Sequence, residues 1–191
     1  MAYTSQYPTE HTTTYVKATS EFSASWHPWY ATDPTKSLTG EPALNSWLAG
    51  ATTNQRFHID LGSAKIIKRL YFEGMSNPAN QAGYTGYGVQ NFTFWGSNDS
   101  GAFAELTYAT DTNWTQLTTS ITAWARHVQS DVEDPQYATV TNTTAYRYYA
   151  MKCADNWGSG DGVGMRRLEL QTEDGGAPAA GQFLTPNSKF W

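Results

Sequence analysis

Apolar and polar residues alternate along several short segments of the chain, and this period of two predicts β-strands. The clearest case is the segment 55–61, where Phe57, Ile59 and Leu61 share one face and the polar residues between them share the other. Gly62 is expected to end this strand. The next apolar run, 66–72, is too short and too rich in β-branched residues for a helix, so it predicts a core strand.

Further strands are expected where the same pattern returns, at 89–95, 115–119, 137–141, 146–152 and 165–172. Many short strands separated by turn residues predict an all-β sandwich or barrel. The adjacent Arg166 and Arg167 fall inside the last of these strands and are expected to be solvated, outward-facing side chains. The acidic stretch 131–135 is expected to be a solvated loop, because its proline lacks a backbone donor and like charges favour water.

Between Glu73 and Gln90 the chain is rich in Gly, Asn and Tyr, and this connection is longer than most loops in compact domains. From Glu173 onward, Gly, Ala and Pro predict a flexible linker. We therefore expect an N-terminal extension at 1–21, one sandwich domain at 22–173, and a linker with an aromatic tail at 174–191. The tail residues Phe183, Leu184, Phe190 and Trp191 would dock either onto a partner or back onto their own domain.

Composition narrows the classes of function. Aromatic and charged residues each make up 15% of the 191 residues, so the surface must rely on uncharged polar groups, which suits β-structure. The net charge of −5 argues against nucleic-acid binding, which needs a basic face. No stretch is apolar enough to span a bilayer. The single cysteine, Cys153, excludes an internal disulfide and is expected to be a buried, small apolar side chain.

The order of the segments resembles the discoidin family, also called coagulation factor 5/8 type C, and its galactose-binding-like relatives among carbohydrate-binding modules. The resemblance covers roughly residues 22–173 and is carried by Ala31-Thr32-Asp33, Trp47, and the segments 55–62, 92–99, 114–117, 146–152 and 164–170. It implies a jelly-roll β-sandwich of two antiparallel sheets. It also implies that loops at one end bind a glycan, a phospholipid or a protein.

The same resemblance bears on metal binding. Many carbohydrate-binding relatives hold a structural calcium between the early loop and a glutamate near the start of the last strand, and Arg167 stands at the matching position here. Calcium would lose a hard oxygen ligand. We therefore predict no metal or other cofactor. The alternative is a weaker calcium site, for which Asp33 and nearby carbonyls are the candidates.

Sugars present apolar C–H faces and rings of hydroxyls, so a sugar site needs aromatic side chains beside a few polar groups. Two loops offer this combination, 25–30 and 155–161, and the two tyrosines of the long loop add to it. The predicted ligand-binding residues are Trp26, His27, Trp29, Tyr30, Tyr84, Tyr87, Asn156 and Trp157. Trp157 is the preferred exposed platform, and the alternative is that these rings cap the core beneath the loops.

Catalysis has little support in the sequence. The four histidines show no metal-ligand spacing, and there is no Gly-x-Ser-x-Gly motif. The leading hypothesis is thus a non-catalytic glycan-binding adhesion module, gaining avidity from several copies as a homo-oligomer.

The alternative hypothesis is a virion subunit, such as a capsid decoration, tail or fibre protein, whose loops and tail contact other subunits. Residues 1–8 lack the basic and apolar regions of a secretory signal. We expect a location on a virion or an extracellular surface.

Overall fold

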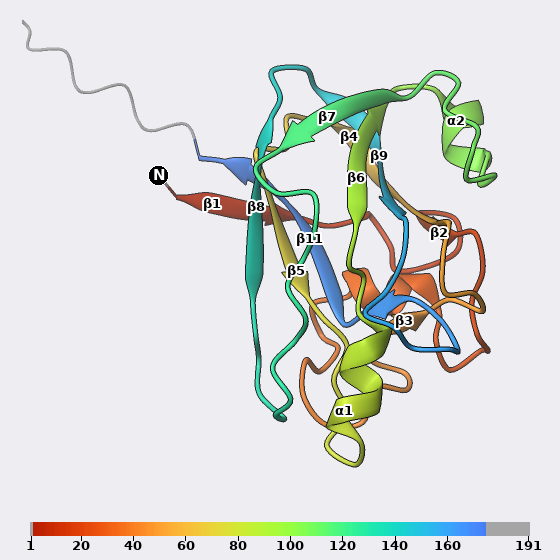
Figure 1. Cartoon of the computed structure of the whole chain (residues 1–191). Coiled ribbons are helices and arrows are strands. Elements are labelled where there is room, and N and C mark those ends of the chain that lie inside the picture. The colour runs from red at the N-terminus through yellow and green to blue at the C-terminus, as the bar shows by residue number, and fades with distance from the viewer. Residues whose placement is uncertain (1, 175–191) are drawn as a thin grey trace, which may run out of the picture.

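Nine strands join into one curled antiparallel sheet within residues 2–174, the part of the chain that the computed structural model describes (Figure 1). Their order across the sheet is β1 (Tyr3–Gln6), β11 (Arg167–Glu173), β5 (Arg69–Glu73), β8 (Gln136–Thr141), β7 (Thr115–Thr119), β6 (Phe92–Ser97), β9 (Tyr146–Cys153), β4 (Gln55–Lys65) and β2 (Val16–Ala18). Strands β1 and β2 both come from the first 21 residues, so the sheet includes part of the expected N-terminal extension.

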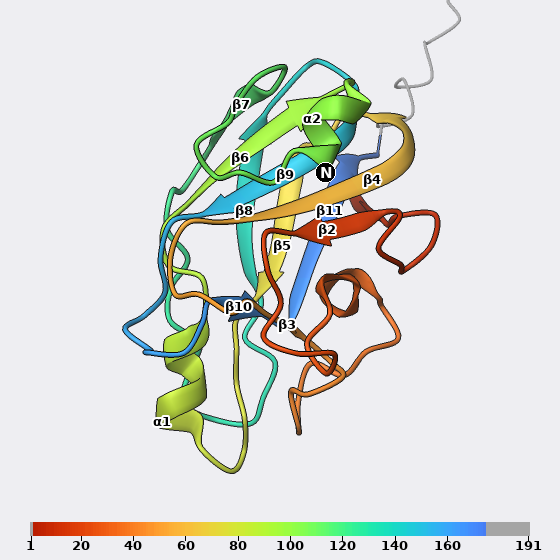
Figure 2. The same cartoon turned by 90° about the vertical axis from the view of Figure 1, so that its right-hand side faces the viewer.

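The sheet turns a corner at β7 and β8, which share only the pairs Thr118–Thr141 and Thr119–Val140. On one side of the corner lie β8, β5, β11 and β1, and on the other lie β6, β9, β4 and β2 (Figure 2). The two layers pack face to face. The predicted all-β jelly-roll sandwich is confirmed. A separate pair, β3 (Trp47–Leu48) with β10 (Gly164–Met165), closes one end.

The core lies between the layers and is filled by alternate side chains of each strand. Phe57, Ile59 and Leu61 of β4 point inward, as the alternation predicts. Trp124 is stacked between Phe72 and Phe92, with ring centroids 4.5 and 4.6 Å apart and interplanar angles of 4° and 7°. This aromatic stack joins the two layers.

Gly62 does not end its strand, contrary to expectation. Strand β4 continues to Lys65, and its pairing with β9 shifts register between Asp60 and Lys65. Gly62 has a φ of +72°, and its amide donates to Asp60 Oδ1 at 2.7 Å. The glycine therefore forms an irregularity inside the strand, because its left-handed backbone is strained for other residues.

The polar face of β4 is covered rather than solvated. Helix α2 (Ser100–Ala104) and the segment that follows lie over it. His58 Nδ1 lies 3.0 Å from the carbonyl oxygen of Phe103, and Arg56 Nη1 lies 3.2 Å from Asp111 Oδ1. Polar side chains on this face are buried because each has a partner.

The expectation for Arg166 and Arg167 is wrong. Their exposed fractions are 0% and 3%. Both guanidiniums donate hydrogen bonds to backbone carbonyls of distant loops. They are buried with partners that the spacing of residues in the sequence does not reveal. Two other expectations are confirmed, since Cys153 is buried and the acidic stretch 131–135 is largely exposed.

The long connection after β5 contains two short helices, α1 (Gln81–Tyr84) and η2 (Thr85–Tyr87). A third, η1 (Pro28–Thr32), begins at a proline, which presets the backbone of a first helical turn. No helix in residues 2–174 is long and apolar enough to cross a membrane. Figure 1 shows α1 at the opposite end of the sandwich from the free end of the β1–β11 pair, where the described residues start and finish.

Candidate functional site

The eight predicted ligand-binding residues separate into two groups in the structure. Trp26, Tyr84, Tyr87, Asn156 and Trp157 gather at the α1 end, and we call them the loop cluster. His27, Trp29 and Tyr30 pack against one another at η1, and we call them the η1 cluster. Although Trp26 and His27 are neighbours in the chain, their side chains join different groups.

The loop cluster is built on a buried tryptophan. Trp26 is 8% exposed and packs with Leu48 and Met75, so it lies beneath the loops, as in the alternative in which these rings cap the core. Tyr84 lies above it, with ring centroids 6.5 Å apart. Tyr84 and Tyr87 meet edge to face at 5.2 Å and 84°, the arrangement that aromatic quadrupoles favour.

The 156–161 loop is fastened to this group by hydrogen bonds. The backbone amide of Trp157 donates to the Gly86 carbonyl at 3.0 Å. The Tyr87 hydroxyl donates to Asp161 Oδ2 at 2.7 Å. Burial and this hydrogen bond raise the pKa of Tyr87, so its hydroxyl stays protonated and Asp161 stays in place. The result is a set of half-buried rings beside an exposed carboxylate.

Asn156 is 9% exposed and hydrogen-bonds to the backbone of its own loop. Its amide group donates to the carbonyls of Ser159 and Gly162 at 3.0 and 2.6 Å, and its oxygen accepts from the Gly158 amide at 2.8 Å. Trp157 is half-buried, not a fully exposed platform, and its Nε1 has no partner among the described residues.

In the η1 cluster, three side chains fix one another. The His27 ring stacks on Trp29 at 3.9 Å and 18°, and His27 Nδ1 lies 2.7 Å from Glu21 Oε2. Tyr30 meets Trp29 at 5.9 Å, and Lys36 Nζ lies 4.5 Å from the Tyr30 ring. Glu21 was absent from the predicted set, because nothing in its spacing marks it as a partner of His27.

The early loop that would hold calcium is already filled by guanidinium groups. Arg166 donates to the carbonyls of Ser37 and Thr39 at 3.4 and 3.3 Å, to that of Gly40, and to that of Ser76 at 2.6 Å. Arg167 donates to the Lys36 carbonyl at 2.7 Å. We call these five carbonyls with their two arginines the guanidinium cage.

Calcium does not fit this arrangement, because two positive charges occupy the carbonyls it would need and the carboxylate position is an arginine. Asp33 is engaged locally: its Oδ1 accepts from the Thr35 amide and hydroxyl at 2.9 and 2.7 Å. Although burial disfavours its charged form, these bonds hold the pKa of Asp33 below its ordinary value. Among residues 2–174, no three His, Cys, Asp or Glu side chains gather as metal ligands would.

Comparison with known proteins gives a match in structure but not in sequence. No protein-family model matches the chain, and no curated protein matches it. Among solved structures, the family 32 carbohydrate-binding module of Clostridium perfringens NanJ, in complex with galactose, aligns with a TM-score of 0.58 at 12% identity. The alignment covers 90% of this chain and all of that one.

The chain has the fold of a family 32 carbohydrate-binding module. The structure of a mutant form of chitosan-binding module 1, from a Paenibacillus sp. IK-5 chitosanase/glucanase, also aligns with this chain. Its TM-score is 0.54 at 21% identity, covering 82% of this chain and 92% of that one. A further C. perfringens module, in complex with GalNAc-β-1,3-galactose, has a TM-score of 0.53 at 13% identity over 81% and 92%.

The family 32 fold confirms the galactose-binding-like resemblance that the order of the segments indicated. Some of these structural relatives are modules of enzymes, one from a chitosanase/glucanase and another from a family 31 glycoside hydrolase of Clostridium perfringens. The tail residues Phe183, Leu184, Phe190 and Trp191 lie outside the described residues.

Proposed function

We propose that this chain is a non-catalytic glycan-binding module and that the loop cluster holds the sugar. The observation that carries the proposal is the Tyr84–Tyr87 pair with its hydrogen bond to Asp161, because it puts aromatic rings and a carboxylate side by side. Aromatic rings contact the apolar C–H face of a pyranose, and a carboxylate accepts hydrogen bonds from its hydroxyls.

Preorganisation supports this assignment. The Trp157 and Ser159 amides both donate to the Gly86 carbonyl, at 3.0 and 3.4 Å, so the two loops that supply the rings are joined before any ligand arrives. A site held in this way loses little conformational entropy on binding. Tyr84 and Tyr87 pack against the buried group that contains Trp26.

The structural relatives agree with a glycan as ligand. Their complexes hold galactose, chitotriose and GalNAc-β-1,3-galactose. We therefore propose a hexopyranose of a cell-surface or polymeric glycan as the ligand. Several copies on one particle or surface would convert weak single-site binding into adhesion.

The test is a glycan-array screen of the full chain, followed by titration of each hit against Tyr87→Ala and Trp157→Ala. We expect each substitution to weaken binding by about tenfold or more, equivalent to about 1.4 kcal/mol. The matched control is Tyr137→Ala, because Tyr137 is 48% exposed on the outer face of β8 and belongs to neither cluster.

Two results would count against the proposal. One is a folded protein that binds no glycan on the array. The other is binding that both loop-cluster variants retain at full strength, which would move the sugar to another part of the surface.

A further inference from the structure

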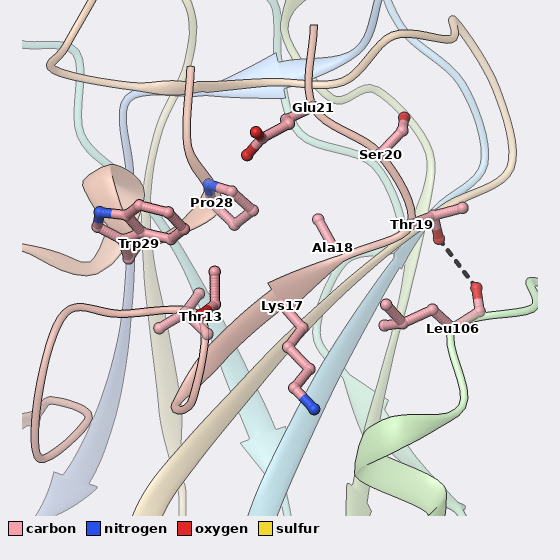
Figure 3. A pocket seen from close by; sticks show the side chains of 10 residues that line it. Thr13, Lys17, Ala18, Thr19, Ser20, Glu21, Pro28, Trp29 and Leu106 are labelled. Carbon is pink, nitrogen blue, oxygen red and sulfur yellow. Dashed lines mark hydrogen bonds between the residues drawn. The ribbon is translucent and has the colours of Figure 1, made fainter. Parts of the chain in front are cut away.

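A hollow lies on the side of the sandwich, between the edge strand β2 and helix η1 (Figure 3). Its volume is about 400 Å3, within the range of small-molecule sites. It is lined by residues 16–21 together with Thr13, Pro28, Trp29 and Leu106. No residue of the loop cluster contributes to it.

The walls of this hollow are mainly apolar and include one aromatic ring. Figure 3 shows Pro28 and Trp29 on one side and Ala18 of β2 on the other. Leu106 closes a third side, where its carbonyl accepts a hydrogen bond from the Thr19 hydroxyl at 3.0 Å. The walls therefore come from β2 and the residues after it, from the start of η1 a few residues later, and from Leu106, which is far away in the sequence.

Polar groups stand at the rim. Figure 3 shows the Glu21 carboxylate above the hollow, the Thr13 side chain below it, and Lys17 on β2. Glu21 Oε2 lies 2.7 Å from His27 Nδ1, and its Oε1 has no hydrogen bond or ion pair among the described residues. That oxygen is available to accept hydrogen bonds from a ligand.

The aromatic and acidic side chains of this hollow are fixed in advance. His27 binds Glu21 on one side and stacks on Trp29 at 3.9 Å on the other, so a single imidazole positions both. Tyr30 supports Trp29 from a third direction. Side chains held in this way lose little rotamer freedom when a ligand enters.

We propose that this hollow is a second carbohydrate site that takes one hexopyranose unit. The Trp29 ring would contact the C–H face of the sugar, and Glu21 Oε1 would accept from its hydroxyls. Glu21 and Lys17 put one negative and one positive charge at the rim, so the formal charge of the rim is zero. The inference rests on the proposed glycan-binding function, but it concerns different residues.

The test follows each site separately by NMR, titrating the ¹⁵N-labelled full chain with galactose and with chitotriose. The indole N–H signals of Trp29 and Trp157 report on the two sites. We expect at least one sugar to shift the Trp29 indole and the amides of residues 17–21, in a saturating manner.

Glu21→Gln keeps the shape of the side chain and removes its charge, so the fold should remain. It is expected to weaken the titration at Trp29 by about tenfold, equivalent to about 1.4 kcal/mol, without changing the one at Trp157. The control is Glu133→Gln, which changes an exposed carboxylate outside both sites.

Failure of this inference differs from failure of the proposed function. If neither sugar shifts the Trp29 signals at tens of millimolar, or if Glu21→Gln leaves their titration unchanged, there is no sugar site at β2. If the signals of Trp157 and its loop stay still while those of Trp29 titrate, the loop cluster is the wrong assignment and the β2 site stands.

Discussion

The guanidinium of Arg166 donates to the carbonyl oxygen of Ser76 at 2.6 Å, across 90 residues of sequence. The same group binds carbonyls of Ser37, Thr39 and Gly40. One side chain thus ties the early loop to the connection that carries α1 and the two tyrosines of the loop cluster. Because Arg166 is fully buried, its removal takes the donor from the buried Ser76 carbonyl, whereas the Thr39 carbonyl still accepts from the Ser37 hydroxyl at 2.8 Å.

We expect Arg166→Met to lower the free energy of unfolding by about 3 kcal/mol or more, since each stranded buried acceptor costs about 1–3 kcal/mol. Arg166→Lys keeps a charge but not the planar fork, and should lose most of the same stability. Urea unfolding measures both. The comparison variant is Arg126→Met, a half-buried arginine whose loss should cost about 1 kcal/mol. An equal loss of unfolding free energy in Arg126→Met and Arg166→Met would contradict the stabilising role of the guanidinium cage.

Calcium should not stabilise the protein. Since two guanidiniums fill the carbonyls of the early loop, neither added calcium nor EDTA is expected to move the thermal midpoint. Differential scanning calorimetry of the full chain with each additive checks this. A midpoint that rises steadily with calcium concentration would show that the cage admits a metal.

His58 should make the protein less stable in acid. Its Nε2 accepts a hydrogen bond from Arg56 Nε at 3.1 Å, so the ring must stay neutral, and burial lowers its pKa to about 4. The unfolded chain takes up this proton near pH 6.5, whereas the folded chain does not until about pH 4. The contribution of His58 is therefore complete above pH 6.5 and is lost as the pH falls toward 4.

The expected loss is on the order of 3 kcal/mol across that window. Unfolding free energies measured by urea at several pH values, for the wild type and for His58→Gln, isolate it from other titrating groups. The wild-type curve should fall more steeply below pH 6.5 than the variant curve. Parallel curves would mean that His58 takes up its proton equally in both states.

Trp124 should be the most costly core residue to shorten. Its ring is buried between Phe72 and Phe92, so Trp124→Ala removes contacts on both faces and is expected to cost about 3–5 kcal/mol. Trp124→Phe keeps a ring in the stack and removes an indole N–H that has no partner in the described structure, so it should cost less than half as much. Urea unfolding of both variants gives the comparison.

Cys153 should be inert in the folded protein. It is fully buried within β9, and burial raises the pKa of its thiol, so little thiolate forms near neutral pH. We expect a thiol reagent such as Ellman's to react only as fast as the protein unfolds, and rapidly in denaturant. Rapid reaction under native conditions would show that β9 opens locally.

Local pattern predicted the strands because alternation depends only on neighbouring residues. Phe57, Ile59 and Leu61 face the core as expected. The local pattern did not predict the burial of Arg166. The carbonyls that accept its hydrogen bonds lie 90 to 129 residues away and carry no sequence signature. Long-range backbone partners are set by the folded topology alone.

The candidate site shows the same limit. The aromatic content of the 25–30 and 155–161 loops was visible in the sequence, but their division into two clusters was not. Pro28 starts η1 immediately after His27, and the turn sends Trp26 toward Tyr84 and His27 toward Glu21. The residue at which a one-turn helix begins decides which side chains meet. Such a short helix leaves only a weak pattern in the sequence.

The pairing of β1 with β11 has a consequence for how the sandwich can be combined with other proteins. Tyr3 lies opposite Glu173, and the Asp174 amide donates to the Ala2 carbonyl at 3.0 Å, so the described segment starts and finishes at one point. A domain of this kind can be inserted into a surface loop of a host protein, or circularly permuted, without being stretched. Because α1 lies at the opposite end, such an insertion would present the loop cluster outward, away from its host (Figure 1).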